Sequence, residues 1–444
     1  MAAPASTGKQ PRAKKPGSIK KPRTEPINVK STDKLVDAAT AVAMLGVKLQ
    51  SLYAYVSRGW VRAVPAASGK GNLYFVEDLE ALGARGRSRG DSVSAERVIR
   101  WGGGAIMQTA ITSIGPDGPR YRGNLAADLA ASQRPFEDCA ELLWNGILPD
   151  ASVLWQPVAP GPEFQALSAG IAGIAGRNPS RRLLAVVVEA YAASLGKHPE
   201  LTLGAPALAG RQLVQVMAAA LGLLGEQPEY VLSQRPQAIA ALVADRLRVR
   251  TDADALWAIN AALILSADNE LAPATFAARI AASAGSDIFS CVTTALGAFE
   301  GMLTGVGCDE AEAMLRQTAN DPDRYLALLA ARIDRKSPLA GYNHPLYPAG
   351  DPRARLLMDI ARQVVAPGGQ GAVALHCIDQ AQARLLLKPN LPLGLLAVCL
   401  ALEAPAGAAG AVMALGRTAG WIAHALEQRL AGFLVRPRAR YVGP

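Results

Sequence analysis

The chain has 444 residues, half of them apolar, and a formal net charge of +9. This length and composition predict two or three folded units with a sizeable core. No secretory signal follows the early charges and no apolar run reaches the ~18 residues of a membrane helix, which predicts no membrane association. The five cysteines lie in apolar sequence without metal-ligand spacing, which predicts no metal site and a reducing cytoplasm as the location.

The basic charge of the chain is concentrated at its N-terminus. Residues 1–34 carry nine Lys and Arg against two acidic residues, residues 35–92 add a net +2, and residues 93–444 are neutral overall. The first segment has five prolines and almost no large apolar side chains, so it cannot bury enough surface to offset chain entropy. We therefore predict a disordered basic arm over residues 1–34.

Residues 35–83 have the pattern of a small, separate folding unit. Two helical stretches each end at a glycine, Gly46 and Gly59, the residue that most easily adopts the left-handed turn after a helix. The predicted elements are helices over 36–45, 48–58 and 77–82 and strands over 61–64 and 73–76. The pattern resembles the winged helix-turn-helix of MerR-type regulators and excisionases, in which the run Tyr-Phe-Val-Glu-Asp-Leu, here residues 74–79, recurs.

A helix-turn-helix places its second helix in the DNA major groove, where cations supply affinity and polar side chains supply sequence choice. The candidate DNA-binding residues on the second helix and the wing are Lys48, Gln50, Ser51, Tyr53, Tyr55, Arg58, Lys70 and Asn72. The alternative is a protein-interaction or dimerisation module that kept the fold, which the modest charge of residues 35–92 favours. Residues 84–92 are predicted to be a flexible basic linker.

Residues 93–444 are predicted to be almost entirely helical, which makes the chain a mainly α protein. Apolar residues recur at three- and four-residue steps, and several segments are apolar nearly all round, so these helices must be buried against one another. The clearest predicted helices span 182–195, 256–267, 277–303 and 418–430.

One stretch within residues 93–444 carries a motif that is specific to a known family. The sequence Gly-Tyr-Asn-His-Pro-Leu-Tyr over 341–347, followed by Asp-Pro-Arg over 351–353, resembles the Gly-Phe-Gly-His-Arg-Val-Tyr and Asp-Pro-Arg signature of citrate synthases. Further landmarks of that family fall in the same order along the chain: Ala-Asp-Asn-Glu-Leu over 267–271, Leu-Thr-Gly over 303–305 and Pro-Asn-Leu-Pro over 389–392. The resemblance covers about residues 93–444.

The resemblance implies a two-domain helical fold that closes over its substrates. By position, the large domain is expected at 93–305 plus 396–444 and the small domain at 306–395. It also implies a dimer in which each site borrows one arginine, here Arg436, from the other subunit. The partner is expected to be a second copy or an intact citrate synthase paralogue.

The family's reaction joins acetyl-CoA, oxaloacetate and water to give citrate and CoA, and its anion-binding residues have counterparts here. Arg353, Arg417 and Arg436 match arginines that hold an oxo-dicarboxylate such as oxaloacetate, a role suited to charge-assisted pairs of hydrogen bonds. His344 matches the histidine that polarises the ketone. Asn269 stands where a substrate-binding histidine is expected, and its amide keeps the capacity to donate.

The acyl-CoA half of the reaction lacks its expected groups. Pro392 stands at the position of the aspartate base and cannot accept a proton, and Thr304 replaces the histidine that steadies the enolate oxygen. Loss of the base alone costs about 3–5 kcal/mol of transition-state stabilisation. No cofactor is expected, and acetyl-CoA or another acyl-CoA remains a candidate ligand.

Three hypotheses remain open. The chain is a metabolite-responsive regulator that has lost catalysis and carries a DNA-binding domain, or it is a subunit that lends Arg436 to an intact paralogue. The third hypothesis is an active condensing enzyme with altered catalytic residues. Loss of the base together with retained anion binding favours the first two.

Overall fold

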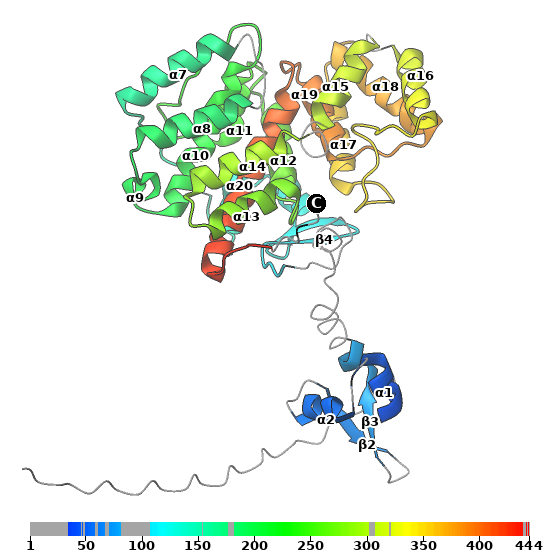
Figure 1. Cartoon of the computed structure of the whole chain (residues 1–444). Coiled ribbons are helices and arrows are strands. Elements are labelled where there is room, and N and C mark those ends of the chain that lie inside the picture. The colour runs from blue at the N-terminus through cyan, green and yellow to red at the C-terminus, as the bar shows by residue number, and fades with distance from the viewer. Residues whose placement is uncertain are drawn as a thin grey trace, which may run out of the picture. The chain divides into compact units, whose positions relative to one another are not determined.

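The computed structural model (Figure 1) describes residues 34–45, 47, 49–57, 61–66, 71–80, 107–152, 154–175, 182–301, 307–318, 321–437, 441 and 443. The chain divides into two compact units, residues 1–106 with 437–444, and residues 107–436. The predicted arm, apart from Lys34, and the predicted linker over 84–92 lie outside the described residues.

The N-terminal unit contains a helix pair and a small sheet. Its elements are β1 (Leu35–Val36), α1 (Ala38–Leu45), α2 (Leu49–Ser57), β2 (Ala63–Pro65) and β3 (Asn72–Phe75), followed by a helical turn over 76–80. Ala41, Leu52 and Tyr74 lie in its core, and the sheet has the order β1-β3-β2. The predicted elements are all present within a few residues, but the expected two-stranded wing is a three-stranded sheet because β1 pairs with β3.

Arg62 fixes the sheet of this unit to the helical turn that follows it. Its backbone N–H and Nε both donate to Asp78 Oδ2, each within 2.9 Å, and its guanidinium lies 4.4 Å from the ring centre of Phe75. The hydrogen bond that Arg62 donates to Asp78 raises the pKa of Arg62 and lowers the pKa of Asp78.

The larger unit begins with a β-meander that the sequence analysis did not predict. Strands β4 (Thr112–Gly115), β5 (Gly118–Tyr121) and β6 (Asn124–Leu125) pair antiparallel in that order. The Tyr121 hydroxyl donates to Ile264 O at 3.1 Å, and Arg122 Nη2 donates to Leu143 O at 3.0 Å. The meander therefore satisfies carbonyl groups at the ends of two helices.

The rest of this unit is mainly helical, as predicted. The helices are α5 (Ala126–Ala131), α6 (Phe136–Asn145), α7 (Pro162–Ala175), α8 (Arg182–Ser194), α9 (Pro199–Leu203), α10 (Pro206–Ala220), η1 (Leu221–Leu223), α11 (Ile239–Arg246), α12 (Ala253–Ser266), α13 (Pro273–Ser283), α14 (Ile288–Phe299), α15 (Gly307–Gln317), α16 (Pro322–Asp334), α17 (Pro352–Val364), α18 (Gln370–Leu385), α19 (Leu391–Ala401) and α20 (Ala408–Ala431). One of the predicted helices is wrong: the stretch 277–303 is interrupted. Gly285 adopts φ +87° there, and Asp287 caps α14 by accepting from Ser290 N at 2.9 Å.

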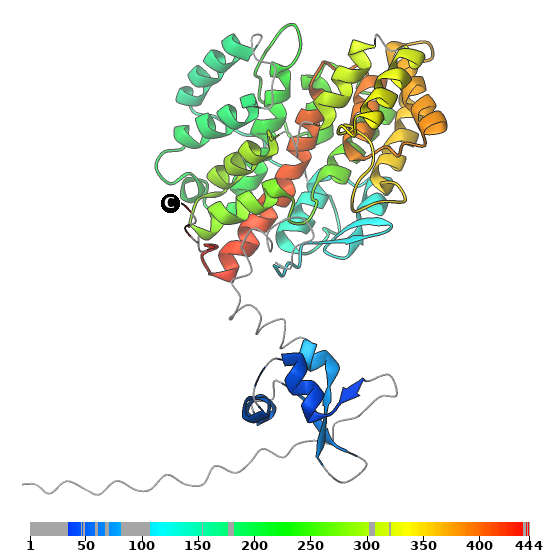
Figure 2. The same cartoon turned by 45° about the vertical axis from the view of Figure 1, so that its right-hand side comes forward.

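Helix α20 runs through the middle of the unit and packs on α12, α13, α14 and α19 (Figures 1 and 2). Two glycines permit its closest approach. A Cβ at Gly416 would lie 2.7 Å from Leu263 O, and one at Gly420 would lie 2.3 Å from Asp268 Oδ1. These contacts bring Arg417, between the two glycines, to the C-terminal end of α12.

Helices α15 to α18 gather on one side of the larger unit, away from α7 to α11 (Figure 1). This grouping resembles the predicted split into a small domain over 306–395 and a large domain. The contacts of the chain do not divide residues 107–436 further, so the boundaries stay a prediction.

Candidate functional site

Arg353 and Asp351 form a buried ion pair at the start of α17. Arg353 Nε donates to Asp351 Oδ1 at 3.0 Å and Nη2 to Oδ2 at 2.9 Å, and the side chains are 2% and 0% exposed. Asp351 also accepts from Leu391 N at 3.2 Å, so one carboxylate anchors the first turns of α17 and α19. Burial raises the pKa of Asp351, but Arg353 outweighs it and holds the pKa below its ordinary value.

Asn269 lies next to this pair and its orientation follows from the chemistry of arginine. Arg353 Nη1 donates to Asn269 Oδ1 at 2.9 Å. Because a guanidinium only donates, the amide oxygen must face it and the NH₂ group must point the other way. The NH₂ group of Asn269 therefore points away from Arg353 and keeps its capacity to donate.

His344 lies in the loop that precedes α17. Leu346 N donates to His344 Nδ1 at 3.1 Å, so Nδ1 carries no proton and Nε2 is the donor of the neutral ring. Burial, followed by the nearby Arg353 and Arg417, lowers the pKa of His344. The ring is thus a neutral hydrogen-bond donor at physiological pH.

Arg417 lies on α20, 4% exposed, and its Nη1 is buried without a hydrogen-bond partner among the described residues. Burial and the neighbouring Arg353 lower its pKa, although an arginine keeps its charge at neutral pH. An unsatisfied buried donor costs about 1–3 kcal/mol, which an anionic ligand would relieve. We name Asn269, His344, Arg353 and Arg417 the donor cage.

Behind the donor cage lies a buried polar network that the sequence analysis missed. Arg279 Nη1 donates to His424 Nδ1 at 3.2 Å, so His424 Nε2 carries the proton and donates to Asp268 Oδ2 at 3.3 Å. Asp268 Oδ2 also accepts from Glu270 N at 3.0 Å. Burial would raise the pKa of Asp268, but His424 and Arg417 hold it below its ordinary value. The partners of His424 lie far away in the sequence, so no local pattern predicts this network.

The surroundings of Pro392 differ from the donor cage. Pro392 lies in the first turn of α19, its backbone oxygen is 3.6 Å from Cys308 Sγ, and a Cβ at Gly307 would lie 3.3 Å from its ring. Thr304 lies outside the described residues, in the segment that leads to Gly307. The side chain of Pro392 is a ring that has no proton acceptor.

Arg436 lies in the segment that follows α20. It is exposed, and the preceding residue is held at the end of α13, where Val435 N donates to Ser283 Oγ at 3.1 Å. Whether it acts in a second copy stays a prediction.

The candidate DNA-binding residues are only partly described. Gln50, Tyr53 and Asn72 are exposed, Ser51 is half-buried, and Tyr55 packs against the core of the N-terminal unit. Lys48, Arg58 and Lys70 lie outside the described residues.

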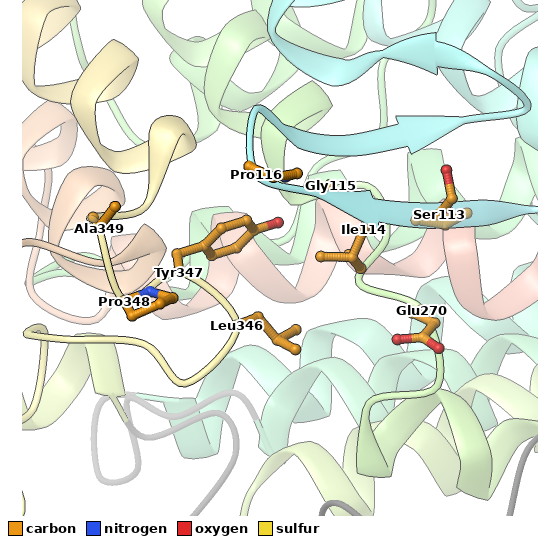
Figure 3. Close-up of a pocket in the computed structure, with 11 residues that line it drawn as sticks. Ser113, Ile114, Gly115, Pro116, Glu270, Leu346, Tyr347, Pro348 and Ala349 are labelled. Atoms are coloured by element: carbon orange, nitrogen blue, oxygen red, sulfur yellow. The ribbon is translucent and has the colours of Figure 1, made fainter. Parts of the chain in front are cut away.

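A cavity of about 700 Å³ opens between β4, Glu270 and the loop after His344 (Figure 3). The side chains of Ile114, Leu346 and Tyr347 line it, and Glu270, which follows Asn269, lies at its rim. Among the described residues no group of three or more His, Cys, Asp or Glu could hold a metal ion, and no described helix is long and apolar enough to cross a membrane.

Comparison with known proteins supports the resemblance. A family model described as "Citrate synthase, C-terminal domain" matches residues 101–438. The chain is 33% identical over 190 residues to citrate synthase 2 of Bacillus subtilis, covering 42% of this chain and 51% of that protein. It is 27% identical over 354 residues to 2-methylcitrate synthase 2 of Corynebacterium glutamicum, covering 76% and 92%.

Solved structures show the same fold. The ternary complex of carboxymethyl coenzyme A and oxaloacetate with citrate synthase from Thermoplasma acidophilum matches with a TM-score of 0.63 at 24% identity, covering 77% of this chain and 94% of that one. The family model spans most of the chain, and the helical fold agrees with it. The chain belongs to the citrate synthase family.

Proposed function

We propose that the donor cage binds an oxaloacetate-like dicarboxylate and that the chain condenses it with acyl-CoA slowly or not at all. The observation that carries this proposal is the unpaired Nη1 of buried Arg417 beside two further donors, Asn269 Nδ2 and His344 Nε2. A set of donors without a free acceptor suits a carboxylate and a ketone oxygen.

The groups around Pro392 support the proposed loss of catalysis. Proton abstraction from a thioester methyl needs a positioned base, and general acid–base catalysis contributes about 10² to 10⁴ in rate. Residue 392 is a proline, so it has no carboxylate or imidazole that could act as the base. Gly307 packs on its ring. Relatives carry the names citrate synthase and 2-methylcitrate synthase, which supports an oxo-acid and an acyl-CoA as the ligands to test.

Calorimetric titration of oxaloacetate, acetyl-CoA and propionyl-CoA, each into the whole protein, tests this proposal. Oxaloacetate is expected to bind with a Kd below about 1 mM, the usual upper range for substrates. Asn269→Asp is the matched variant, because it replaces the donating NH₂ with an anionic oxygen of the same size and is expected to lower the affinity at least about tenfold. Absence of dicarboxylate binding in the wild type refutes the proposal.

The rate of CoA release separates this proposal from an active enzyme. A turnover in the ordinary enzymatic range of about 1–10³ s⁻¹ would establish a condensing enzyme with altered residues and overturn the proposed loss of catalysis. Turnover of a mixture with an intact citrate synthase that exceeds the turnover of that enzyme alone would instead identify a partner subunit.

We further propose that the N-terminal unit binds DNA and makes the chain a ligand-responsive regulator. The supporting observations are its two short helices, the exposed Gln50 and Tyr53 on α2, and the +7 charge of residues 1–34. Affinity for duplex DNA is expected to fall steeply with salt and to weaken when residues 1–34 are deleted. An affinity unchanged by the deletion removes the arm from this proposal, and no binding to duplex DNA at low salt refutes it.

A further inference from the structure

Asn269 is the central residue of a turn that the Asp268 side chain closes. Asp268 Oδ2 accepts from Glu270 N at 3.0 Å, two residues further on, which is the hydrogen bond of an Asx turn. Glu270 adopts φ +54°, a left-handed conformation that is uncommon outside glycine. The direction in which the Asn269 side chain leaves the backbone therefore depends on how the Asp268 carboxylate is held.

His424 contacts the same carboxylate oxygen. His424 Nε2 lies 3.3 Å from Asp268 Oδ2, and both side chains are 0% exposed. Arg279 Nη1 donates to His424 Nδ1 at 3.2 Å, and a guanidinium cannot accept, so the ring keeps the tautomer in which Nε2 donates. The hydrogen bond from His424 to Asp268 therefore has a fixed direction.

Arg279 is held in turn by side chains of α20. It is 2% exposed, its Nε donates to Gln428 Oε1 at 3.0 Å, and its Nη1 donates to Glu427 Oε2 at 2.6 Å. Glu427 Oε1 also accepts from Ala110 N at 2.8 Å, just before β4 begins. The network thus runs from the start of the meander, through α20 and α13, to the turn that carries Asn269.

The packing of α13 on α20 does not require these buried charges. Helix α13 also packs on α14, and replacing a buried ion network with apolar side chains of similar volume is often neutral or stabilising by about 1–4 kcal/mol. A fully satisfied polar network instead fixes one arrangement of the groups at its end. The group at the end of this network is Asn269.

We propose that His424 is a positioning residue for the donor cage. Its Nε2–H, directed by Arg279, holds the Asp268 carboxylate in the Asx turn. The turn keeps Asn269 Oδ1 on Arg353, so that the amide NH₂ faces the ligand. The proposal rests on the proposed function, in which Asn269 donates to a dicarboxylate, and it gives His424 no contact with that ligand.

Two substitutions of similar size separate the hydrogen bonds of His424 from its packing. The amide of His424→Gln can accept from Arg279 and donate to Asp268 as the imidazole does, whereas His424→Met cannot donate. Oxaloacetate affinity, measured by calorimetry on variants that thermal melting shows to be folded, is expected to stay within about threefold of wild type for His424→Gln. It is expected to fall at least about tenfold for His424→Met. His376→Met, on an exposed histidine of α18, is the control and is expected to change nothing. Equal affinities in the Gln and Met variants overturn the proposal.

A second pair of variants makes the same comparison at Asp268, in case His424→Met does not fold. Asp268→Asn and Asp268→Ala both remove the carboxylate charge, but only the amide oxygen of Asp268→Asn can still accept from Glu270 N and His424. Asp268→Asn is expected to retain the oxaloacetate affinity within about threefold, and Asp268→Ala is expected to lose at least about tenfold. Equal affinities in these two variants contradict a role of the Asx turn.

Crystal structures of the His424 variants without ligand give a readout that does not depend on oxaloacetate. In His424→Met, Asn269 Oδ1 is expected to leave its 2.9 Å contact with Arg353 Nη1, which His424→Gln should keep. An unchanged contact in His424→Met overturns the positioning role, even if the affinity falls. A wild type that binds no dicarboxylate refutes the proposed function, whereas a displaced Asn269 in His424→Met would still support the positioning role.

Discussion

The donor cage and the neighbourhood of Pro392 share one anchor, Asp351, yet they are built differently. On one side Asp351 holds Arg353 through two hydrogen bonds, and Arg353 in turn orients Asn269. On the other side Asp351 accepts only from the backbone of Leu391, and the next side chain is a proline packed against Gly307.

The donor cage and the neighbourhood of Pro392 differ in how many side chains depend on one another for their positions. Arg353 depends directly on buried Asp351 and Asn269 depends on Arg353, so losing that carboxylate disturbs both donors. A catalytic base at position 392 would be a single side chain at a helix start, whose replacement leaves the helix and its anchor in place. A replacement at position 392 would therefore remove a base without disturbing Asp351, Arg353 or Asn269.

The largest expected effect is on the shared anchor. Asp351→Asn leaves buried Arg353 without its counter-ion and should destabilise the fold by about 3–5 kcal/mol at pH 7. Because the pKa of Asp351 is lowered from 3.8, this stabilisation is present above that pH and is lost as the pH falls through the folded pKa. Urea unfolding should show a constant gap to wild type from about pH 5 to 8 that shrinks below about pH 4.

Asp379→Asn is the control, since its pair with Arg362 is 42% exposed on both sides and should be worth at most about 1 kcal/mol. Equal losses in the two variants would contradict the dependence of the donor cage on Asp351.

Arg417→Leu should affect ligand binding and stability in opposite directions. The variant is expected to lower oxaloacetate affinity by at least about 100-fold, which corresponds to ~2.7 kcal/mol, because a buried charge partner is lost. Without ligand it should melt at a higher temperature, since a buried cation with an unsatisfied donor is replaced by an apolar side chain. Calorimetry and thermal melting measure the two effects, with Arg335→Leu as the control. A lower melting temperature without ligand would show that Arg417 is already satisfied.

Introducing the catalytic residues expected of the family tests the part of the comparison that concerns Pro392. The combined change Asn269→His, Thr304→His and Pro392→Asp should raise citrate formation by about two orders of magnitude, measured as CoA release. Pro392→Asp alone should help less, because groups that act together are not additive. Replacing Pro392→Asp by Pro392→Asn in the triple variant is the control, since an amide is no base. A triple variant that binds oxaloacetate and makes no citrate would place the defect in acyl-CoA binding.

The smallest expected effect concerns the contact that brings α20 to the donor cage. Gly420→Ala puts a methyl group within 2.3 Å of Asp268 Oδ1 and should cost about 1–3 kcal/mol with a matching loss of ligand affinity. Gly170→Ala on α7 meets no atom within 4 Å and should stabilise by about 0.5–1 kcal/mol. Equal effects on oxaloacetate binding would show that α20 does not position Arg417.

Periodicity was enough to predict most of the larger unit as buried helices, and α8 and α12 begin and end within a few residues of the prediction. The single helix predicted over 277–303 was wrong because the apolar pattern continues across a break. Gly285, Ser286 and the capping Asp287 mark that break in the sequence. Helix α20 starts ten residues before its predicted beginning, since glycines such as Gly410 lower helix propensity while tight packing favours them. The sequence pattern did not predict the meander because its strands are only two to four residues long.

The positions of the donor cage followed from family motifs, and the fold brings Asn269, His344, Arg353 and Arg417 together. The link from Arg279 through His424 to Asp268 joins residues more than 140 positions apart, and no local pattern reveals such a contact. Glu270 and Tyr347 stand inside recognised motifs, but their place at a cavity depends on the meander.

The unsatisfied guanidinium of Arg417 has a consequence for the lifetime of the protein. A ligand that binds only the folded state stabilises it in proportion to the logarithm of its concentration, by about 2.7 kcal/mol at 100 times the Kd. Occupancy of the donor cage at that level would lower the unfolded fraction about 100-fold, and unfolded chains are those that cellular proteases degrade. Supply of the dicarboxylate would then set how long each molecule survives, even if no molecule ever turned it over.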